Sequence, residues 1–346
     1  YYWPDEVATA QLLTDLAEKL AARGRPTRVV TSHDGAAATP RKENRHGVDI
    51  VRLRATRWGR WGILGKACDY LTFTLAARRT LLPELRQGDR LVAMTDPPTL
   101  AQLAAAAGRR PGAALIHWLQ DIHPELELAL SGSRWLAAAS RSWVHRRDLA
   151  WRTAHACVVI SRDMAGLVRE HGVPDGRIHV IPNWAPGGEA LAPVAPEQNP
   201  LRQEWNLAGK FVVAYSGNFG RVHALEPVIE AAARLRDEPD LVFLFVGDGP
   251  RRPALEAAVR SQGLKNVRFL PFQPRTRLAE NLSAGDVHLV TLRPGCERCV
   301  FPSKLYGILA VGRPVVYFGP PHCELADTVR RSGAGIVVDV AQPVAL

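Results

Sequence analysis

Apolar runs of strand length alternate with helical patterns along the whole chain. Leu12, Leu16 and Leu20 recur at helical spacing within residues 9–23, and Gly24 follows them, so this segment predicts a helix with a glycine stop. The runs that favour strands in the first half are 28–32, 90–98, 114–125, 153–161 and 178–183. The second and third of these runs end in polar loops. Repeated strand and helix units are typical of an α/β fold.

The same alternation restarts after residue 200, and glycine or proline loops follow the strands. The predicted strands are 210–215, 241–246, 267–270 and 286–292. The last one leads into residues 297–316, which predict a loop, a helix that starts near Ser303 and Lys304, and another strand after Gly312.

A break in the pattern divides the chain. Residues 184–200 are too rich in proline and glycine to form a core element. The length of 346 residues also exceeds what one hydrophobic core usually fills. We therefore predict an N-terminal domain over residues 1–186, a linker over residues 187–200 and a C-terminal domain over residues 201–346.

Two features of the second half favour a phosphate ligand. Gly217, Gly247 and Gly249 stand in loops after strands, where backbone N–H groups can approach a ligand that a side chain would block. Ser303 and Lys304 add a hydroxyl and a cation at the start of a predicted helix. Loops of this kind at one sheet edge favour a nucleotide, whereas an ordinary strand and helix unit with a capped helix is the alternative.

Polar residues in the first half follow the predicted strands. Asp96, Asp121 and His123 fall after the carboxyl ends of their strands, which is where ligands bind in open α/β sheets. Asp121 can orient or deprotonate a hydroxyl, and His123 can act as a base. The alternative for Asp121 is a helix cap or a salt bridge to Arg146 or Arg147, and a lone histidine is often structural.

Composition narrows the class of protein. The hydrophobic fraction of 47% and the charged fraction of 23% are those of a globular enzyme, and no apolar run is long enough to span a membrane. The five cysteines are scattered, as expected in a reducing compartment, so we expect a cytoplasmic protein. Cys296 and Cys299 have the spacing of zinc ligands, but no second pair accompanies them, so we predict no metal site.

The net charge of +10 is largest in the first domain, where cations alternate with aromatic residues. The residues concerned, within 52–66, are Arg52, Arg54, Arg57, Arg60, Lys66, Trp58 and Trp61. Such a stretch suits a membrane interface or a polyanionic acceptor, and the alternative is a solvated loop whose tryptophans pack inward. Nucleic acid is not expected as a partner, because no recognisable binding module accompanies the charge.

Several motifs together resemble glycosyltransferase family 4, over nearly the whole chain. They are Tyr1-Tyr2-Trp3-Pro4, Asp121-Ile122-His123-Pro124-Glu125, Ile181-Pro182-Asn183-Trp184, Tyr215-Ser216-Gly217-Asn218, Val246-Gly247-Asp248-Gly249-Pro250, and Pro302-Ser303-Lys304 through Gly312-Arg313-Pro314. The resemblance implies an α/β protein in which two Rossmann-like domains face each other across a cleft, the GT-B fold. It is strongest to the branch that builds bacterial O-antigen, capsule and exopolysaccharide.

The resemblance also implies an activity. A retaining, metal-independent hexosyltransferase of this family moves a sugar from a nucleotide-diphosphate donor of UDP or GDP type, without a cofactor. The acceptor would be a glycan or a polyprenyl-diphosphate-linked sugar, which would place the protein in the cytoplasm at the inner face of the membrane.

Site residues carried over from the family motifs fall in both predicted domains. Asp121 and Glu297 are the expected catalytic residues, and Asp96, His123, Arg54 and Arg57 are expected on the acceptor side. The expected donor-binding residues are Ser216, Gly217, Asn218, Arg221, Gly247, Gly249, Phe272, Gln273, Glu297, Ser303 and Lys304. Phe272 and Gln273 would hold the base, Glu297 the sugar, and the others the diphosphate.

The chain departs from the family pattern at three places. The second glutamate of the Glu-x7-Glu signature would fall at Leu305 or Gly307, so the ribose contact is missing. His223 stands where many members have a lysine, so the cationic role passes to Arg221 and Lys304. Thr95 replaces a histidine often found near the acceptor.

Two other functions remain open at this stage. A sugar-nucleotide 2-epimerase shares the two-domain architecture, but its proton transfers need several carboxylates and histidines around the donor sugar. A non-catalytic nucleic-acid-binding protein would account for the basic charge alone.

Overall fold

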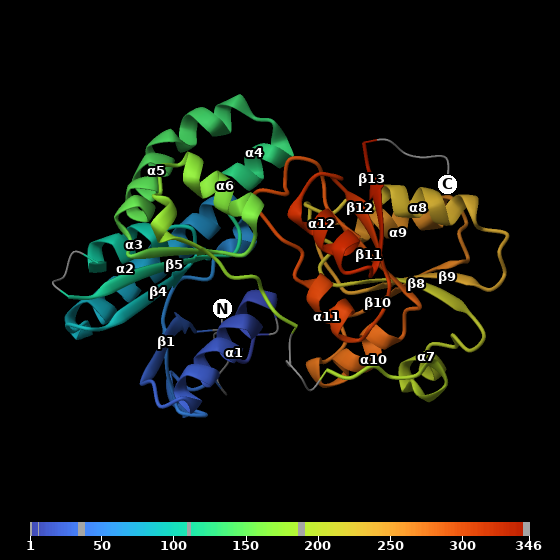
Figure 1. The fold of residues 1–346 in the computed structure, drawn as a ribbon, viewed down its shortest axis with the longest axis horizontal. Helices are drawn as coiled ribbons and strands as arrows, with labels where there is room; N and C mark the ends of the chain where they lie inside the picture. Colours follow the sequence, from blue (N-terminus) through green and yellow to red (C-terminus); the bar gives the residue numbers. More distant parts are fainter. Residues whose placement is uncertain (1, 6, 34–38, 109–111, 186–190, 342–346) are drawn as a thin grey trace. The chain divides into compact units, whose positions relative to one another are not determined.

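The computed structural model describes residues 2–5, 7–33, 39–108, 112–185 and 191–341. The chain divides into two compact units, one of residues 1–128 and 133–182 and the other of residues 129–132 and 183–346. Tyr1 and residues 187–190 of the predicted linker lie outside the described residues. Figure 1 shows the elements of each unit in sequence colours.

The first unit begins with a helix on a small mixed sheet of order β1-β3-β2. β1 (Thr27–Ser32) runs parallel to β3 (Val48–Leu53), and β2 (Lys42–Arg45) runs antiparallel to β3. The helix α1 (Ala8–Ala22) contributes Ala17 to a core that also contains Tyr2, Val29, Val48 and Ile50. The predicted helix and first strand are therefore present, but β2 and β3 were not predicted.

A four-stranded parallel sheet of order β4-β5-β6-β7 forms the rest of the first unit. Its strands are β4 (Arg90–Met94), β5 (Ala114–Leu119), β6 (Ala156–Val159) and β7 (Ile178–Val180). The helices are α2 (Ile63–Glu84), α3 (Leu100–Gly108), α4 (Glu125–Ser131), α5 (Arg134–Thr153) and α6 (Arg162–Glu170), with 3-10 turns η1 (Gly59–Trp61) and η2 (Asp175–Arg177). α3 packs against β4 and β5, and α6 packs against β6 and β7 (Figure 1).

The second unit is built on a six-stranded, all-parallel sheet of order β10-β9-β8-β11-β12-β13. Its strands are β8 (Phe211–Ser216), β9 (Leu241–Val246), β10 (Val267–Leu270), β11 (Val287–Thr291), β12 (Val315–Gly319) and β13 (Gly335–Asp339). Its helices are α7 (Pro200–Glu204), α8 (Glu226–Arg234), α9 (Arg252–Ser261), α10 (Leu278–Ser283), α11 (Lys304–Ala310) and α12 (Glu324–Arg331), with η4 (Pro196–Gln198) and η5 (Arg275–Arg277). The predicted strands of this half are all present, within a residue or two of their predicted ends.

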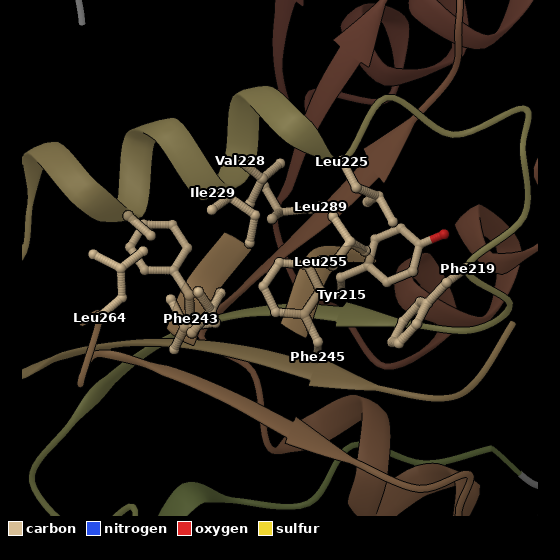
Figure 2. Close-up of a cluster of buried hydrophobic side chains, with 13 residues drawn as sticks. Tyr215, Phe219, Leu225, Val228, Ile229, Phe243, Phe245, Leu255, Leu264 and Leu289 are labelled. Atoms are coloured by element: carbon tan, nitrogen blue, oxygen red, sulfur yellow. The ribbon is translucent and has the colours of Figure 1, made fainter. Parts of the chain in front are cut away.

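Both faces of the six-stranded sheet are buried. Phe243 and Phe245 of β9 pack with α8 and α9 in one cluster, which Figure 2 shows close up. The alternate residues Val242, Leu244 and Val246 pack in a second cluster with Leu201 and Trp205, from α7 and the residue after it. Because side chains alternate across a strand, an uninterrupted apolar run such as β9 requires cover on both faces.

The described end of the predicted linker is attached to the second unit. The backbone N–H of Val194 donates to Ser283 Oγ at 2.9 Å, and the Asn199 side chain donates to the Glu280 carbonyl at 2.8 Å. Asn199 also caps α7, because its side chain accepts from the N–H of Leu201 at 3.0 Å. These bonds place residues 194–199 against α10.

Within the described ranges, none of the helices is both long enough and apolar enough to cross a membrane.

The core shown in Figure 2 yields a first prediction. Phe245→Ala should lower the free energy of unfolding by about 3–5 kcal/mol, because Phe245 is fully buried and its removal leaves a cavity. Phe211→Ala is the matched control, since Phe211 is 50% exposed at the start of β8 and should change stability by less than about 1 kcal/mol. Urea unfolding followed by circular dichroism measures both. Equal losses in the two variants would contradict the assignment of this core.

Candidate functional site

Two glycine loops lie in direct backbone contact at the carboxyl ends of β8 and β9. Gly217 and Gly247 have φ angles of +135° and +141°, which L-residues rarely adopt. A Cβ at Gly247 would lie 2.0 Å from the Gly217 carbonyl oxygen, and a Cβ at Gly249 would lie 2.4 Å from Asn218 Oδ1. A side chain at Gly247 would therefore separate the loops, which explains why glycine stands there.

Lys304, the first residue of α11, reaches these loops. Its ammonium lies 3.5 Å from the centroid of the Tyr215 ring, and a Cβ at Gly217 would lie 3.2 Å from the same nitrogen. The Lys304 ammonium is buried and has no hydrogen-bond partner among the described residues. Burial lowers the pKa of Lys304 well below its ordinary value. An anion placed against this nitrogen would oppose that shift and favour the charged form.

Glu297 also has an unpaired polar atom, one of several in this unit. It lies in the loop between β11 and α11, and its Oε2 atom is buried without a hydrogen-bond partner in the described part of the chain. Ser303 precedes Lys304 and its hydroxyl makes no capping bond to the helix. A carboxylate oxygen and a hydroxyl are thus left available in one loop for a polar ligand.

His223 is held neutral beneath the glycine loop. Its Nδ1–H donates to the Thr291 carbonyl at 2.7 Å, and burial together with the charge of Lys304 lowers the pKa of His223 to about 3. This histidine therefore does not supply the cation that the family pattern has at its position. Arg221, in the same loop, is exposed and makes no hydrogen bond with the described residues.

The remaining predicted donor residues lie at the same sheet edge. The Asn281 amide donates to Ser216 Oγ at 2.9 Å, which orients the hydroxyl at the end of β8. Phe272 and Gln273 follow β10, and Phe272 is 54% exposed while the Gln273 amide donates to the Pro271 carbonyl at 3.1 Å. Carboxyl ends of neighbouring parallel strands meet at one edge, so these residues flank the glycine loops.

The two positions at which the second signature glutamate could stand are both buried. Leu305 is fully buried in the core of the second unit, and Gly307 is buried in α11. Neither offers a polar group to a ribose. Sequence reasoning also missed Tyr215, whose ring lies under Lys304 and whose hydroxyl donates to the Asn218 carbonyl at 2.8 Å. A sequence signal for Tyr215 was its position directly before Ser216, a predicted donor-binding residue.

Of the predicted site residues of the first unit, Asp121 and His123 line one cavity, whereas Asp96, Arg54 and Arg57 are not among its lining residues. The walls of this cavity include Met94, Thr95, Pro98, His117, Asp121, His123, Trp143 and Arg147. Thr95 Oγ1 accepts the backbone N–H groups of Gln120 and Asp121, both at 3.3 Å. The threonine that replaces a family histidine therefore braces the backbone at Asp121.

Asp121 and His123 have shifted pKa values. Burial raises the pKa of the Asp121 carboxyl, and the charge of Asp96 adds to the shift while that of His123 opposes it. Burial likewise raises the pKa of Asp96. Burial alone would lower the pKa of His123, but a 2.7 Å hydrogen bond to Glu127 and the nearby carboxylates raise it instead. Shifts of this kind are common where proton transfer occurs.

The alternative interpretation of Asp121 as a partner of Arg147 is wrong. Arg147 is fully buried and donates to Glu125 at 2.5 and 2.8 Å, to Asp148 at 2.8 Å and to the His123 carbonyl at 2.5 Å. Its guanidinium stacks on Trp151 at 4.1 Å. This network stabilises the loop after β5. The Asp121 carboxylate receives no hydrogen bond from any described residue.

His171 completes this network. It contacts Asp148 at 2.9 Å and Glu125 at 3.2 Å, and these hydrogen bonds raise the pKa of His171 to about 9. Burial opposes ionisation of Glu125, but hydrogen bonds from His171 and Arg147 lower the pKa of Glu125 to about 2. Two cations and two carboxylates are thus paired in the interior, which is the arrangement that buried charges require.

The basic stretch needs one correction. Arg52 is only 4% exposed and its guanidinium binds the Pro40 and Trp3 carbonyls and Glu43, so it does not belong to a binding surface. Arg54 and Arg57 are exposed, and their place on the acceptor side stays a prediction. The alternative that the tryptophans pack inward is wrong, because Trp58 and Trp61 are 43% and 65% exposed.

Metal ligands do not gather in the described ranges of the chain. No group of three or more His, Cys, Asp or Glu side chains there is placed to hold an ion. Cys296 and Cys299 are buried and form no disulfide, and burial raises the pKa of Cys296 to about 11.

Comparison with known proteins defines the class. Residues 9–184 match the glycosyl transferase 4-like domain and residues 210–346 match the glycosyl transferases group 1 family. The chain therefore belongs to the group 1, family 4 glycosyltransferases, enzymes that use nucleotide sugars, and the predicted α/β fold with two Rossmann-like domains of GT-B type is confirmed.

Individual relatives agree with this class. WcaI of Escherichia coli K12, a candidate glycosyl transferase of colanic acid biosynthesis, is 30% identical over 94% of this chain and 83% of its own length. The structure of Anabaena HepE in complex with UDP and glucose has a TM-score of 0.72 at 20% identity, covering 99% of this chain and 85% of that one. WaaG, a glycosyltransferase of lipopolysaccharide biosynthesis, has a TM-score of 0.70 at 16% identity, covering 98% of this chain and 84% of its own.

The His171 network makes stability depend on pH. The folded pKa of His171, about 9, exceeds the unfolded value of about 6.5, so its contribution is complete below pH ~6.5 and is lost as pH rises through about 9. Between pH ~6.5 and pH about 9, the free energy of unfolding of the wild type should fall by on the order of 1–3 kcal/mol more than that of His171→Gln. Urea titrations at both pH values measure the difference.

The exposed His179 provides the control for this prediction. His179→Gln should keep the pH dependence of the wild type. If His171→Gln keeps it as well, the ion-pair assignment of His171 is wrong.

Proposed function

We propose that this glycosyltransferase is a retaining hexosyltransferase of surface polysaccharide synthesis. It transfers a sugar from a UDP- or GDP-linked donor to a glycan or polyprenyl-diphosphate-linked acceptor. One observation carries the donor side, namely the buried Lys304 ammonium that lies against Gly217 without an anionic partner among the described residues. The similarity to WcaI supports the polysaccharide context.

Lys304 and the glycine loops bind the donor diphosphate in this proposal. Backbone N–H groups near Gly217, Gly247 and Gly249 approach the phosphate oxygens, because no side chains stand in the way. The amide of Asn218, the hydroxyls of Ser216 and Ser303, and the guanidinium of Arg221 complete the site. As the bond to the anomeric carbon breaks, negative charge grows on the leaving diphosphate, and Lys304 and Arg221 stabilise it there.

Glu297 and the loop after β10 bind the two ends of the donor. The unpaired Oε2 of Glu297 accepts hydroxyl groups of the transferred sugar. The exposed ring of Phe272 and the amide of Gln273 contact the base. HepE binds UDP and glucose, which favours a uridine nucleotide as the first donor to test. The ribose is held without a second glutamate, since Leu305 is buried at that position.

Asp121 acts on the acceptor hydroxyl. In its ionised form it orients that hydroxyl and accepts its proton, and Asp96 and His123 set the local charge. The exposed Arg54 and Arg57 attract an acceptor that carries a diphosphate. In this proposal the protein works in the cytoplasm, in peripheral contact with the inner face of the membrane through residues 54–66.

The role of Lys304 is tested by binding. UDP should raise the melting temperature of the wild type by mass action, and Lys304→Met should weaken UDP binding by roughly tenfold or more. Without nucleotide the variant should be at least as stable as the wild type, because it removes an unpaired buried charge. Thermal-shift titrations with UDP, GDP, ADP and dTDP measure both effects and identify the base.

Lys265→Met is the matched control for Lys304→Met, since Lys265 is an exposed lysine of the same unit. It should bind nucleotide as the wild type does. Unchanged UDP affinity in Lys304→Met would exclude Lys304 from the donor site.

The role of Asp121 is tested by turnover. Asp121→Asn should lower kcat by roughly 10²-fold or more, because an amide cannot accept the acceptor proton, while UDP affinity stays unchanged. Initial rates of sugar transfer, together with nucleotide titrations, measure the two effects separately. Asp237→Asn, at an exposed aspartate of the second unit, is the control. Full activity in Asp121→Asn would leave the acceptor base unassigned and refute this role.

A further inference from the structure

An uncovered row of leucines runs along the helix α2. Leu64, Leu71 and Leu75 are 82%, 58% and 43% exposed. Their spacing places them within about 40° of one another around the helix axis, so they form one ridge. Phe73 and Ala77 are buried, so a different side of the helix packs on the unit. We call Leu64, Leu71 and Leu75 the α2 ridge.

Trp58 and Trp61 stand directly before this helix. Their rings stack at 5.7 Å between centroids and 19° between planes, and both are exposed. Aromatic rings of this kind favour the boundary between lipid headgroups and acyl chains. We call these two residues the tryptophan pair.

The loop that carries the tryptophan pair is fixed to the helix. The Asp69 carboxylate accepts the backbone N–H groups of Trp58 and Gly59, each at 2.8 Å. A Cβ at Gly65 would lie 1.8 Å from the Trp58 carbonyl oxygen, so only glycine permits this close approach. The tryptophans are therefore presented beside the first turns of α2 by a defined local structure.

Positive charge accompanies these apolar groups along the chain. Arg54 and Arg57 precede the tryptophan pair, Lys66, Arg78 and Arg79 lie on α2, and all five are exposed. In the sequence from residue 50 to residue 83 there is one acidic residue, Asp69, and its carboxylate is engaged by the tryptophan loop. A surface with exposed apolar groups, aromatic rings and cations has the chemistry of a bilayer interface with anionic headgroups.

We propose that the α2 ridge and the tryptophan pair insert into the headgroup region of a bilayer that contains anionic lipids. The leucines and indoles enter the acyl boundary while the accompanying arginines and lysine contact lipid phosphates. A second copy of the chain fits this surface poorly, because a symmetric contact would bring the same cations together. The proposal rests on the membrane contact that is part of the proposed function. The residues that make the contact differ, because the buried Arg52 is left out and α2 is included.

Vesicle sedimentation with the full chain tests the proposal. The protein should sediment with vesicles of phosphatidylcholine and phosphatidylglycerol, should bind phosphatidylcholine vesicles much less, and should be released as salt increases. Trp58→Ser with Trp61→Ser, and separately Leu71→Glu with Leu75→Glu, should each weaken binding by roughly tenfold or more.

Leu235→Glu is the matched control, since Leu235 is 41% exposed in the second unit. It should bind vesicles as the wild type does. UDP-induced stabilisation should be unchanged in all of these variants, which shows that they fold and separates failure of lipid binding from failure of the donor site.

Three results would overturn the proposal. They are no sedimentation of the wild type with either vesicle, equal binding to the two vesicle types, and wild-type binding in both ridge and tryptophan variants. A wild-type dimer that dissociates in Leu71→Glu with Leu75→Glu would show that a second copy covers the surface instead.

Discussion

The backbone contact between the loops at Gly217 and Gly247 is the constraint on which the proposed donor site depends. A Cβ on the second glycine would lie 2.0 Å from the carbonyl oxygen of the first, so the carboxyl ends of β8 and β9 come together only without side chains. Lys304 then reaches over both loops to the ring of Tyr215. A buried ammonium left in this state costs free energy that a bound phosphate offsets, so the same geometry that is unfavourable for folding favours a nucleotide.

The first unit handles a buried cation in the opposite way. Arg147 is only 2% exposed, but Glu125, Asp148 and the His123 carbonyl satisfy its guanidinium. Arg147 therefore stabilises the loop after β5, and its guanidinium needs no ligand to complete its hydrogen bonds. The Asp121 carboxylate, which lies at the cavity, receives no hydrogen bond from this network. In both units, the hydrogen bonds of the described residues leave the principal proposed site groups unpaired, namely the Lys304 ammonium, Glu297 Oε2 and the Asp121 carboxylate.

How far the sequence could predict the structure differs between the two halves. The strands of the second half are continuous apolar runs closed by glycine or proline, as in Leu241–Val246, because both faces of a parallel sheet are buried. In the first half, β2 consists of four polar residues and charged residues interrupt β3, so neither forms a continuous apolar run. The helix α2 was not predicted because Leu64, Leu71 and Leu75 face outward, so its apolar residues do not share one buried face.

The sequence by itself determined the fold class, the family and which residue types follow each strand, because these depend on local periodicity and on ordered motifs. Only the tertiary structure decided which charges are engaged. Arg52 and Arg54 are two residues apart, yet one is buried against Glu43 and the other is exposed. The Lys304 ammonium has no hydrogen-bond partner among the described residues, while Arg147 has several. The reason is physical, since the state of a charge depends on neighbours that are distant in the chain and that only packing brings together.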